Sequence, residues 1–210
     1  MLPHIALTGK AGCGKDTAGR WLVERHGYRR ASFADGVRDV LLAIDPVVVL
    51  GPQHTADADG LQSRGIRLST IVERHGWERA KRLQEVRTLL QRTGTEAGRD
   101  IFGPDVWVNL LMERVRHETR PLVVTDVRFP NEADACADLG AVVVRIRRDG
   151  AGAGAHVSET AMDGYPVAYE VDNNGSVDDL HAAMDAIVLR HERVERENRL
   201  VLRHDHRAVL

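Results

Sequence analysis

The chain has 210 residues, of which 43% are hydrophobic and 29% charged. This length suits one α/β domain, and this composition excludes disordered, collagen-like and disulfide-scaffold proteins. The 29 basic and 31 acidic residues leave a formal net charge of −2, so we expect neither stable binding of nucleic acid nor attraction to an anionic membrane.

Short apolar runs alternate with helical patterns along the chain. Strands are predicted at His4–Thr8, Ala31–Phe33, Leu122–Thr125, Ala141–Ile146 and Ala168–Val171. Several of these runs are apolar throughout, which is typical of strands that a parallel sheet buries on both faces. Helices are predicted from the turn after the first strand to Gly27, from Pro104 onward, and over Asn131–Leu139. The pattern therefore predicts an α/β fold with a parallel sheet.

Three segments depart from this alternation. Residues 45–65 hold a short apolar run and then no period, and residues 67–99 are helical without an intervening strand, so 45–103 is predicted to be an inserted loop and helical segment. Three glycines and three alanines at 149–155 predict a hinge in a lid-like segment, 147–167. Residues 191–210 are strongly charged and are expected to extend the last helix or form a tail beyond a single domain at 1–190.

A glycine-rich loop follows the first predicted strand and opens the first helix. It reads Gly9-Lys10-Ala11-Gly12-Cys13-Gly14-Lys15-Asp16-Thr17, which is the phosphate-loop pattern in the strand–loop–helix context that it requires. Its glycines let backbone N–H groups turn toward one point, and the helix N-terminus adds a positive dipole. The loop is therefore predicted to wrap a di- or triphosphate, with Lys15 neutralising the transferring group. An ordinary glycine-rich turn is the alternative.

Two acidic residues are candidate metal ligands. Asp16 stands where Ser or Thr usually ligates Mg²⁺, so we expect Asp16 to reach the metal and Thr17 to contact a phosphate. The alternative is that Asp16 only complements the helix dipole. Asp126 ends an apolar strand at the sheet edge where ligands bind in doubly wound folds.

Seven blocks that run in order from residue 14 to residue 176 carry a family resemblance. They are 14–17, 32–35, 89–99, 105–107, 125–133, 156–159 (His-Val-Ser-Glu) and 172–176. These blocks resemble the deoxynucleoside monophosphate kinases typical of bacteriophages, which have the P-loop nucleoside monophosphate kinase fold. The family's usual Phe-Ala-Asp-Pro-Leu-Lys is here Phe-Ala-Asp-Gly-Val-Arg at 33–38. Arg38 keeps the positive charge, but the proline is lost.

The resemblance implies a P-loop NTPase three-layer sandwich with a five-stranded parallel sheet and an inserted helical acceptor-binding segment. It implies phosphorylation of a deoxynucleoside 5′-monophosphate by ATP with Mg²⁺, with ATP and the monophosphate as partners. The implied catalytic residues are Lys15, Arg128, Arg147 and Arg148. The implied acceptor contacts are Phe33, Asp35, Arg38, Arg92, Thr95, Glu96, Arg99, Trp107, Asp126 and Arg128, and Asn174 with Gly175 joins residues 9–17 in binding ATP.

Each of these side chains also has a purely structural interpretation. A chain with so many arginines carries most of them in solvent. Asp35 would cap the helix that starts there, and Trp107 would be a core residue. Arg147 and Arg148 would be a charged strand end, and the Asn174–Gly175 turn needs no ligand.

Two other functions fit the phosphate loop. One is a kinase of another small phosphorylated metabolite, of the dephosphocoenzyme A type. The other is a nucleotide-dependent switch or ATPase module, although the guanine-reading Asn-Lys-x-Asp pattern is absent from the sequence. The beginning of the chain lacks a signal-peptide pattern and no 18-residue apolar run occurs, so a cytoplasmic protein is expected, in the host cytoplasm if a phage encodes it. Two distant cysteines predict no zinc site. The sequence leaves a homodimer open.

Overall fold

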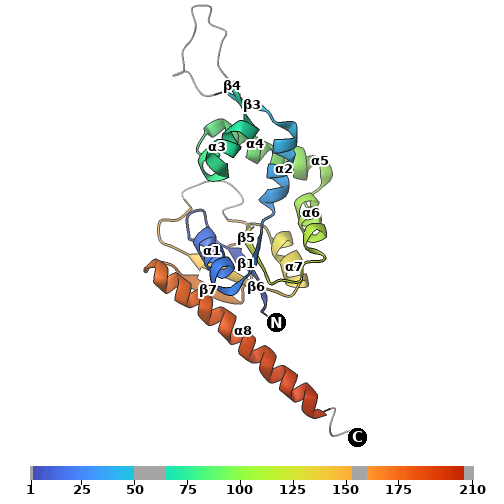
Figure 1. Ribbon diagram of the computed structural model, residues 1–210, viewed down its shortest axis with the longest axis vertical. Helices are drawn as coiled ribbons and strands as arrows, with labels where there is room; N and C mark the ends of the chain where they lie inside the picture. The colour runs from blue at the N-terminus through green and yellow to red at the C-terminus, as the bar shows by residue number, and fades with distance from the viewer. Residues whose placement is uncertain (1, 50–64, 153–159, 206–210) are drawn as a thin grey trace, which may run out of the picture. The chain divides into compact units, whose positions relative to one another are not determined.

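The computed structural model describes residues 2–49, 65–152 and 160–205. The chain divides into two compact units (Figure 1). The first unit consists of Met1–Ser32 and Leu111–Leu210, and the second of Phe33–Leu110. The second unit contains the predicted insertion at 45–103 and is longer than it on both sides.

A five-stranded parallel sheet forms the first unit. Its order is β2-β5-β1-β6-β7. The strands are β1 (His4–Thr8), β2 (Arg29–Ala31), β5 (Leu122–Val127), β6 (Ala141–Arg147) and β7 (Tyr169–Asp172), and the helices are α1 (Lys15–His26), α7 (Pro130–Asp138) and α8 (Val177–Asp205). The predicted α/β fold with five parallel strands is confirmed.

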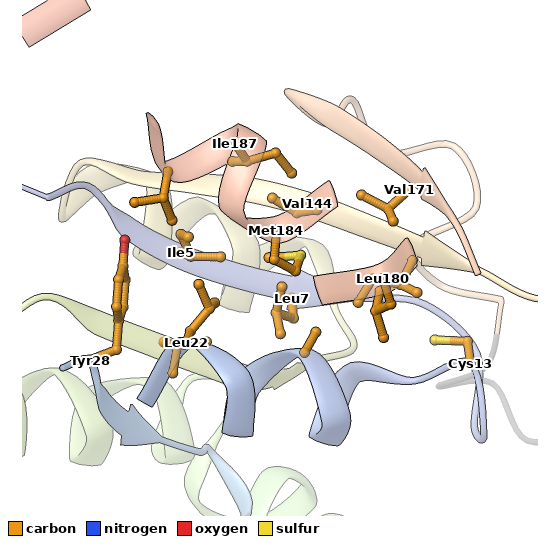
Figure 2. Close-up of a cluster of buried hydrophobic side chains, with 14 residues drawn as sticks. Ile5, Leu7, Cys13, Leu22, Tyr28, Val144, Val171, Leu180, Met184 and Ile187 are labelled. Carbon is orange, nitrogen blue, oxygen red and sulfur yellow. The ribbon is translucent and has the colours of Figure 1, made fainter. Parts of the chain in front are cut away.

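The sheet is covered by helices on both faces. Figure 2 shows Ile5 and Leu7 of β1 packed with Leu22 of α1 and with Leu180 and Met184 of α8. All five side chains are fully buried, and burial of one such side chain contributes about 1.5–3 kcal/mol. Helix α7 lies across the sheet from α1 (Figure 1). This arrangement confirms the predicted three layers.

Two contacts fix α1 in this layer. Gly19 faces β5 so closely that a Cβ atom there would lie 2.5 Å from Cγ2 of Thr125. Two residues further along the helix, the Trp21 indole stacks on His181 of α8 with ring centroids 4.0 Å apart. Trp21 Nε1 and His26 Nε2 both lie within hydrogen-bond distance of Asp185 Oδ1, at 2.7 and 2.6 Å.

Strand β2 begins and ends two residues before the predicted range. Arg29 pairs in register with Leu122 and Ala31 with Val124. The charged residues at 29 and 30 conceal the strand from a search for apolar runs, but β2 is an edge strand, where charge is tolerated. The Arg29 guanidinium donates to Glu118 at 2.7 Å. Hydrogen bonds from Arg120, with help from Arg29, lower the pKa of Glu118 to about 2.

Other element ends lie close to their predicted positions. Helix α1 ends before Gly27, which adopts φ 70° as a C-cap glycine, and α7 starts at Pro130, one residue early. The helix predicted from Pro104 is α6 (Val106–Val115) and begins two residues later. Helix α8 continues to Asp205, so the charged C-terminal segment extends the last helix over most of its length.

The second unit is mainly helical. Its elements are α2 (Ala34–Ile44), β3 (Val47–Val49), β4 (Gly65–Arg67), α3 (Leu68–Ala80), α4 (Gln84–Arg92), a π-helix η1 (Thr93–Arg99), α5 (Asp100–Phe102) and the first half of α6. Strands β3 and β4 pair antiparallel, and residues 50–64 between them lie outside the described residues. Gly76, with φ 70° and ψ 165°, breaks α3. A small core of Leu41, Val48, Leu68, Ile71, Ala80 and Val86 holds these elements together.

Within residues 2–49, 65–152 and 160–205, no helix is both long enough and apolar enough to cross a membrane.

Candidate active site

The glycine-rich loop connects β1 to α1 at the C-terminal edge of the sheet. Gly9, Gly12 and Gly14 have φ values of 135°, 79° and 110°, which other residues rarely adopt. A Cβ at Gly9 would lie 2.2 Å from the Ile146 carbonyl oxygen, so the loop runs directly against β6. The predicted phosphate-loop conformation is therefore carried by backbone that only glycine allows.

The side chain of Lys15 crosses this loop. Its ammonium donates to the carbonyl oxygens of Gly9 at 2.5 Å and Lys10 at 2.9 Å, and it lies 3.7 Å from Cys13 Sγ. A lysine has three N–H donors. The ammonium is thus held against the loop, on the first residue of α1, where an anion would meet both it and the helix N-terminus.

Both predicted metal-binding acids are in the first unit. Asp16 is exposed in the first turn of α1. Asp126 is half-buried near the end of β5, and its Oδ2 accepts a hydrogen bond from Ser32 Oγ at 2.7 Å. No cluster of three or more metal-ligating side chains occurs among residues 2–49, 65–152 and 160–205. Mg²⁺ needs no such cluster, because it is commonly held by one or two carboxylates together with phosphate oxygens, and this donor set fits it.

Glu132 fixes the backbone next to Asp126, and sequence reasoning missed it. Its carboxylate is buried, and its Oε2 accepts the N–H groups of Arg128 at 2.7 Å and Phe129 at 3.2 Å. Glu132 occupies the third position of α7, and its carboxylate caps the backbone N–H of the N-cap residue Phe129. A glutamate two residues after a proline that begins a helix is a signal in the sequence that could have predicted this cap. The Arg128 side chain is exposed and engaged in a contact within the protein.

A cavity of about 450 Å³ lies beside the loop. Its lining includes Gly9, Lys10, Arg147, Arg148 and Asp149. Three of these side chains are cationic, and Arg147 also donates to Glu170 at 2.8 Å. The volume is within the range of small-molecule sites. The structure thus brings both predicted lid arginines to the edge of the phosphate loop.

Arg145 organises the segment that returns from the predicted lid. Its guanidinium donates to Glu170 at 2.8 Å and to the carbonyl oxygens of Met162 at 2.6 Å and Tyr165 at 2.7 Å. Tyr165 in turn donates to Asp134 at 2.8 Å. Burial first and then Asp134 raise the pKa of Tyr165 to about 12. Arg145 was not predicted, because its partners are carbonyls that no motif records.

The turn after β7 is tied to the phosphate loop and to the predicted hinge. Asn173 is buried, and its Nδ2 donates to the Cys13 carbonyl oxygen at 2.8 Å. Asn174 Oδ1 accepts the Asp149 N–H at 2.8 Å. Ser176 and Asp179 bond reciprocally at the start of α8, so Ser176 caps this helix. A contact of Asn174 and Gly175 with ATP stays a prediction.

Arg38 is held in place within the second unit. Its Nη1 pairs with Asp35 at 2.8 Å, and its guanidinium carbon lies 5.8 Å from the Trp77 ring centroid. Its buried Nε has no partner among the described residues. Helix α2 has Phe33 at its N-cap position and no side-chain cap, so the interpretation of Asp35 as a cap is wrong. Asp35 lies one residue inside the helix, where Arg38 is one turn away.

The π-helix organises the other acceptor candidates. Trp107 is buried, and its indole Nε1 donates to the Gly94 carbonyl oxygen at 2.8 Å. Arg99 donates to the same oxygen at 3.3 Å, and Arg92 pairs with Glu96 at 3.0 Å on the exposed side. Trp107 therefore has a core position. Phe33 is also buried, whereas Thr95 is half-buried. Residues 156–159 lie outside the described residues.

Comparison with known proteins relates the chain to one enzyme family. A model of the family described as "Deoxynucleotide monophosphate kinase" matches residues 52–184. A protein of Acanthamoeba polyphaga mimivirus, named "Putative deoxynucleotide monophosphate kinase", is 28% identical over 174 residues, which cover 75% of this chain and 81% of that protein. A protein of Ictalurid herpesvirus 1 (strain Auburn), "Uncharacterized protein ORF76", is 27% identical over 191 residues, which are 87% of this chain and 65% of that protein.

One solved structure is also similar in outline. It is the crystal structure of TT1252 from Thermus thermophilus, with a TM-score of 0.40 and 17% identity over 90% of this chain and 98% of that one.

Proposed function

Because the chain belongs to the deoxynucleotide monophosphate kinase family, we propose that it transfers the γ-phosphoryl group of ATP to a deoxynucleoside 5′-monophosphate. The products are the deoxynucleoside diphosphate and ADP. The family supports a phosphotransferase that acts on deoxynucleotides, and the donor and the products are the further content of the proposal.

The observation that carries the proposal is the loop at 9–17 with the Lys15 ammonium held over it by two carbonyl oxygens. Loop carbonyls are weak partners for an ammonium compared with phosphate oxygens, because a charged acceptor makes the stronger hydrogen bond. Lys15 can exchange them for the β- and γ-phosphate oxygens of ATP and neutralise charge that moves during transfer.

Arg147 and Arg148 supply further positive charge beside the loop. Both line the same cavity as Lys10. Phosphoryl transfer asks little covalent chemistry of the protein, so alignment and neutralisation of the transferring group account for most of the catalysis. We assign both arginines to the γ-phosphate. The Glu170 partner of Arg147 holds that side chain before ATP arrives.

Asp126 and Asp16 are the residues that would hold Mg²⁺. Held there, Mg²⁺ would offset the negative charge of the ATP phosphates. Ser32 orients the Asp126 carboxylate by its hydrogen bond at 2.7 Å. Asp16, on the first turn of α1, is exposed and can contact the metal through water.

We assign the acceptor phosphate to Arg128 of the first unit, and Arg38 of the second unit is a separate candidate for contact with an anion. Glu132 holds the Arg128 backbone, and Asp35 with Trp77 holds the Arg38 guanidinium. The buried Arg38 Nε retains a donor that an anion can use. A guanidinium can grip a phosphate through two parallel bonds.

The test measures ADP release from ATP and Mg²⁺ with a panel of dNMPs, the matching NMPs and dephosphocoenzyme A. The proposal expects ADP in proportion to a dNMP acceptor and almost none without acceptor. ADP release that does not depend on any acceptor would indicate an ATPase module instead. Turnover with dephosphocoenzyme A alone would assign the enzyme to the other metabolite class.

A further inference from the structure

Asn173 occupies an unusual position at the end of β7. It follows the last residue of the strand, and its backbone N–H donates to the Arg147 carbonyl oxygen at 2.7 Å. The hydrogen bonding between β6 and β7 therefore continues one residue past the strand. This anchorage directs a buried side chain at the phosphate loop, 160 residues away in the sequence.

The contact with the loop is specific to one peptide unit. Asn173 Nδ2 donates to the Cys13 carbonyl oxygen at 2.8 Å. In a planar trans peptide the carbonyl and the next N–H point in opposite directions. Because the Cys13 carbonyl points at Asn173, the Gly14 N–H points away from it. The Gly14 N–H makes no hydrogen bond within the part of the chain that the structure describes.

The packing leaves no freedom for this peptide. A Cβ atom at Gly14 would lie 2.4 Å from Asn173 Nδ2, and Gly14 has φ 110°. A second carbonyl of the loop is also occupied, because the Gly152 N–H donates to the Ala11 oxygen at 3.1 Å. Two loop carbonyls are thus occupied by donors from the segments that follow β6 and β7.

We propose that Asn173 is a positioning residue of the phosphate loop, which fixes the Cys13–Gly14 peptide so that the Gly14 N–H donates to a phosphate oxygen of ATP. The inference rests on the proposed use of the loop for ATP. It differs from the predicted ATP contact of Asn174 and Gly175, because Asn173 acts on the loop and through it on the phosphates.

The test compares Asn173→Ala and Asn173→Asp with wild type. Titration with Mg²⁺–ATP alone gives the dissociation constant, and steady-state assays give KM for each substrate. One net hydrogen bond corresponds to about a three- to tenfold loss of ATP affinity in Asn173→Ala, with less than about a twofold change in KM for the dNMP. Asn173→Asp sets two oxygen atoms against each other and is expected to lose more than tenfold.

Tyr28→Phe is the matched control. Tyr28 donates one hydrogen bond to the Pro3 carbonyl oxygen at 2.8 Å, in the same unit and at the opposite end of β1. This variant should lose stability without a change in ATP affinity. Wild-type ATP affinity in Asn173→Ala or, should that variant not fold, in the nearly isosteric Asn173→Asp would overturn the inference. Wild-type protein that binds no ATP would instead refute the proposed function.

Discussion

Trp107→Phe separates a core tryptophan from one that contacts the substrate base. The indole is 5% exposed, and its N–H donates to the Gly94 carbonyl oxygen. Phenylalanine removes this bond, which costs about 0.5–1.5 kcal/mol. The cost stays in that range because Arg99 still donates to the same oxygen. The smaller ring also leaves a void beside Gly98, whose Cβ would lie 2.5 Å from the indole Cζ2.

The void adds a second contribution of similar size, since core substitutions cost more as the residual cavity grows. We therefore expect the free energy of unfolding to fall by about 2–3 kcal/mol. Urea unfolding followed by far-ultraviolet circular dichroism measures this change in the full chain. KM for the dNMP should stay within about threefold of the wild-type value, a difference of less than 1 kcal/mol.

Trp21→Phe is the matched control, because Trp21 also loses one indole hydrogen bond, to Asp185 at 2.7 Å. It should lower stability and leave both KM values unchanged. The reasoning would be refuted if Trp107→Phe changed stability by less than about 0.5 kcal/mol and raised KM for the dNMP tenfold. That result would indicate that the indole contacts the substrate base and is not a core residue.

Three further predictions concern the first unit. Lys15→Ala should abolish ADP release and leave the circular dichroism spectrum unchanged, because the half-buried ammonium contributes charge at the loop; near wild-type turnover would exclude the loop as the ATP site. Arg128→Lys should lower kcat/KM for the dNMP about ten- to a hundredfold and raise KM for ATP less, because a point charge cannot replace a bidentate fork; equal effects on both substrates would indicate a structural arginine. Burial opposes ionisation of Asp185, but hydrogen bonds from His26 and Trp21 outweigh it and hold the pKa of this carboxyl below its ordinary value of 3.8. The stabilisation by the Asp185 carboxylate is therefore present above about pH 4 and is lost as the pH falls through the folded-state pKa. The free energies of unfolding of wild type and Asp185→Asn, measured in urea, should therefore converge in acid. A difference that does not change with pH would contradict this prediction.

The parallel sheet could be predicted because its central strands are buried on both faces. Ile5 to Thr8 and Val123 to Thr125 are almost fully buried, and such runs are visible without any partner. Edge strand β2 was displaced by two residues, because Arg29 and Arg30 give it no apolar run. The π-helix at 93–99 and the break at Gly76 left no periodic signal, since both depend on how the second unit packs.

The phosphate loop was found from the sequence because its function lies in consecutive backbone groups. The residues that hold the site from distant parts of the chain were missed for the opposite reason. Asn173 meets Cys13 across 160 residues, and Arg145 meets carbonyls at 162 and 165. These partners are backbone atoms, which any residue could supply, so no residue pattern records them. Glu132 was also missed, although the sequence holds a signal for it, because helix capping is local.

Gly19 acts as a spacer between the two parts of the site in the first unit. Helix α1 lies on β5 at this residue, with no room for a methyl group against Thr125. Lys15 is about one helical turn, or roughly 6 Å, before it, and Asp126 follows Thr125 directly in the strand. The lack of a side chain at position 19 therefore sets the distance between the loop and the Asp126 carboxylate. Any residue larger than glycine would shift the helix against β5 and misalign the Lys15 ammonium with the Asp126 carboxylate, although position 19 touches neither of them.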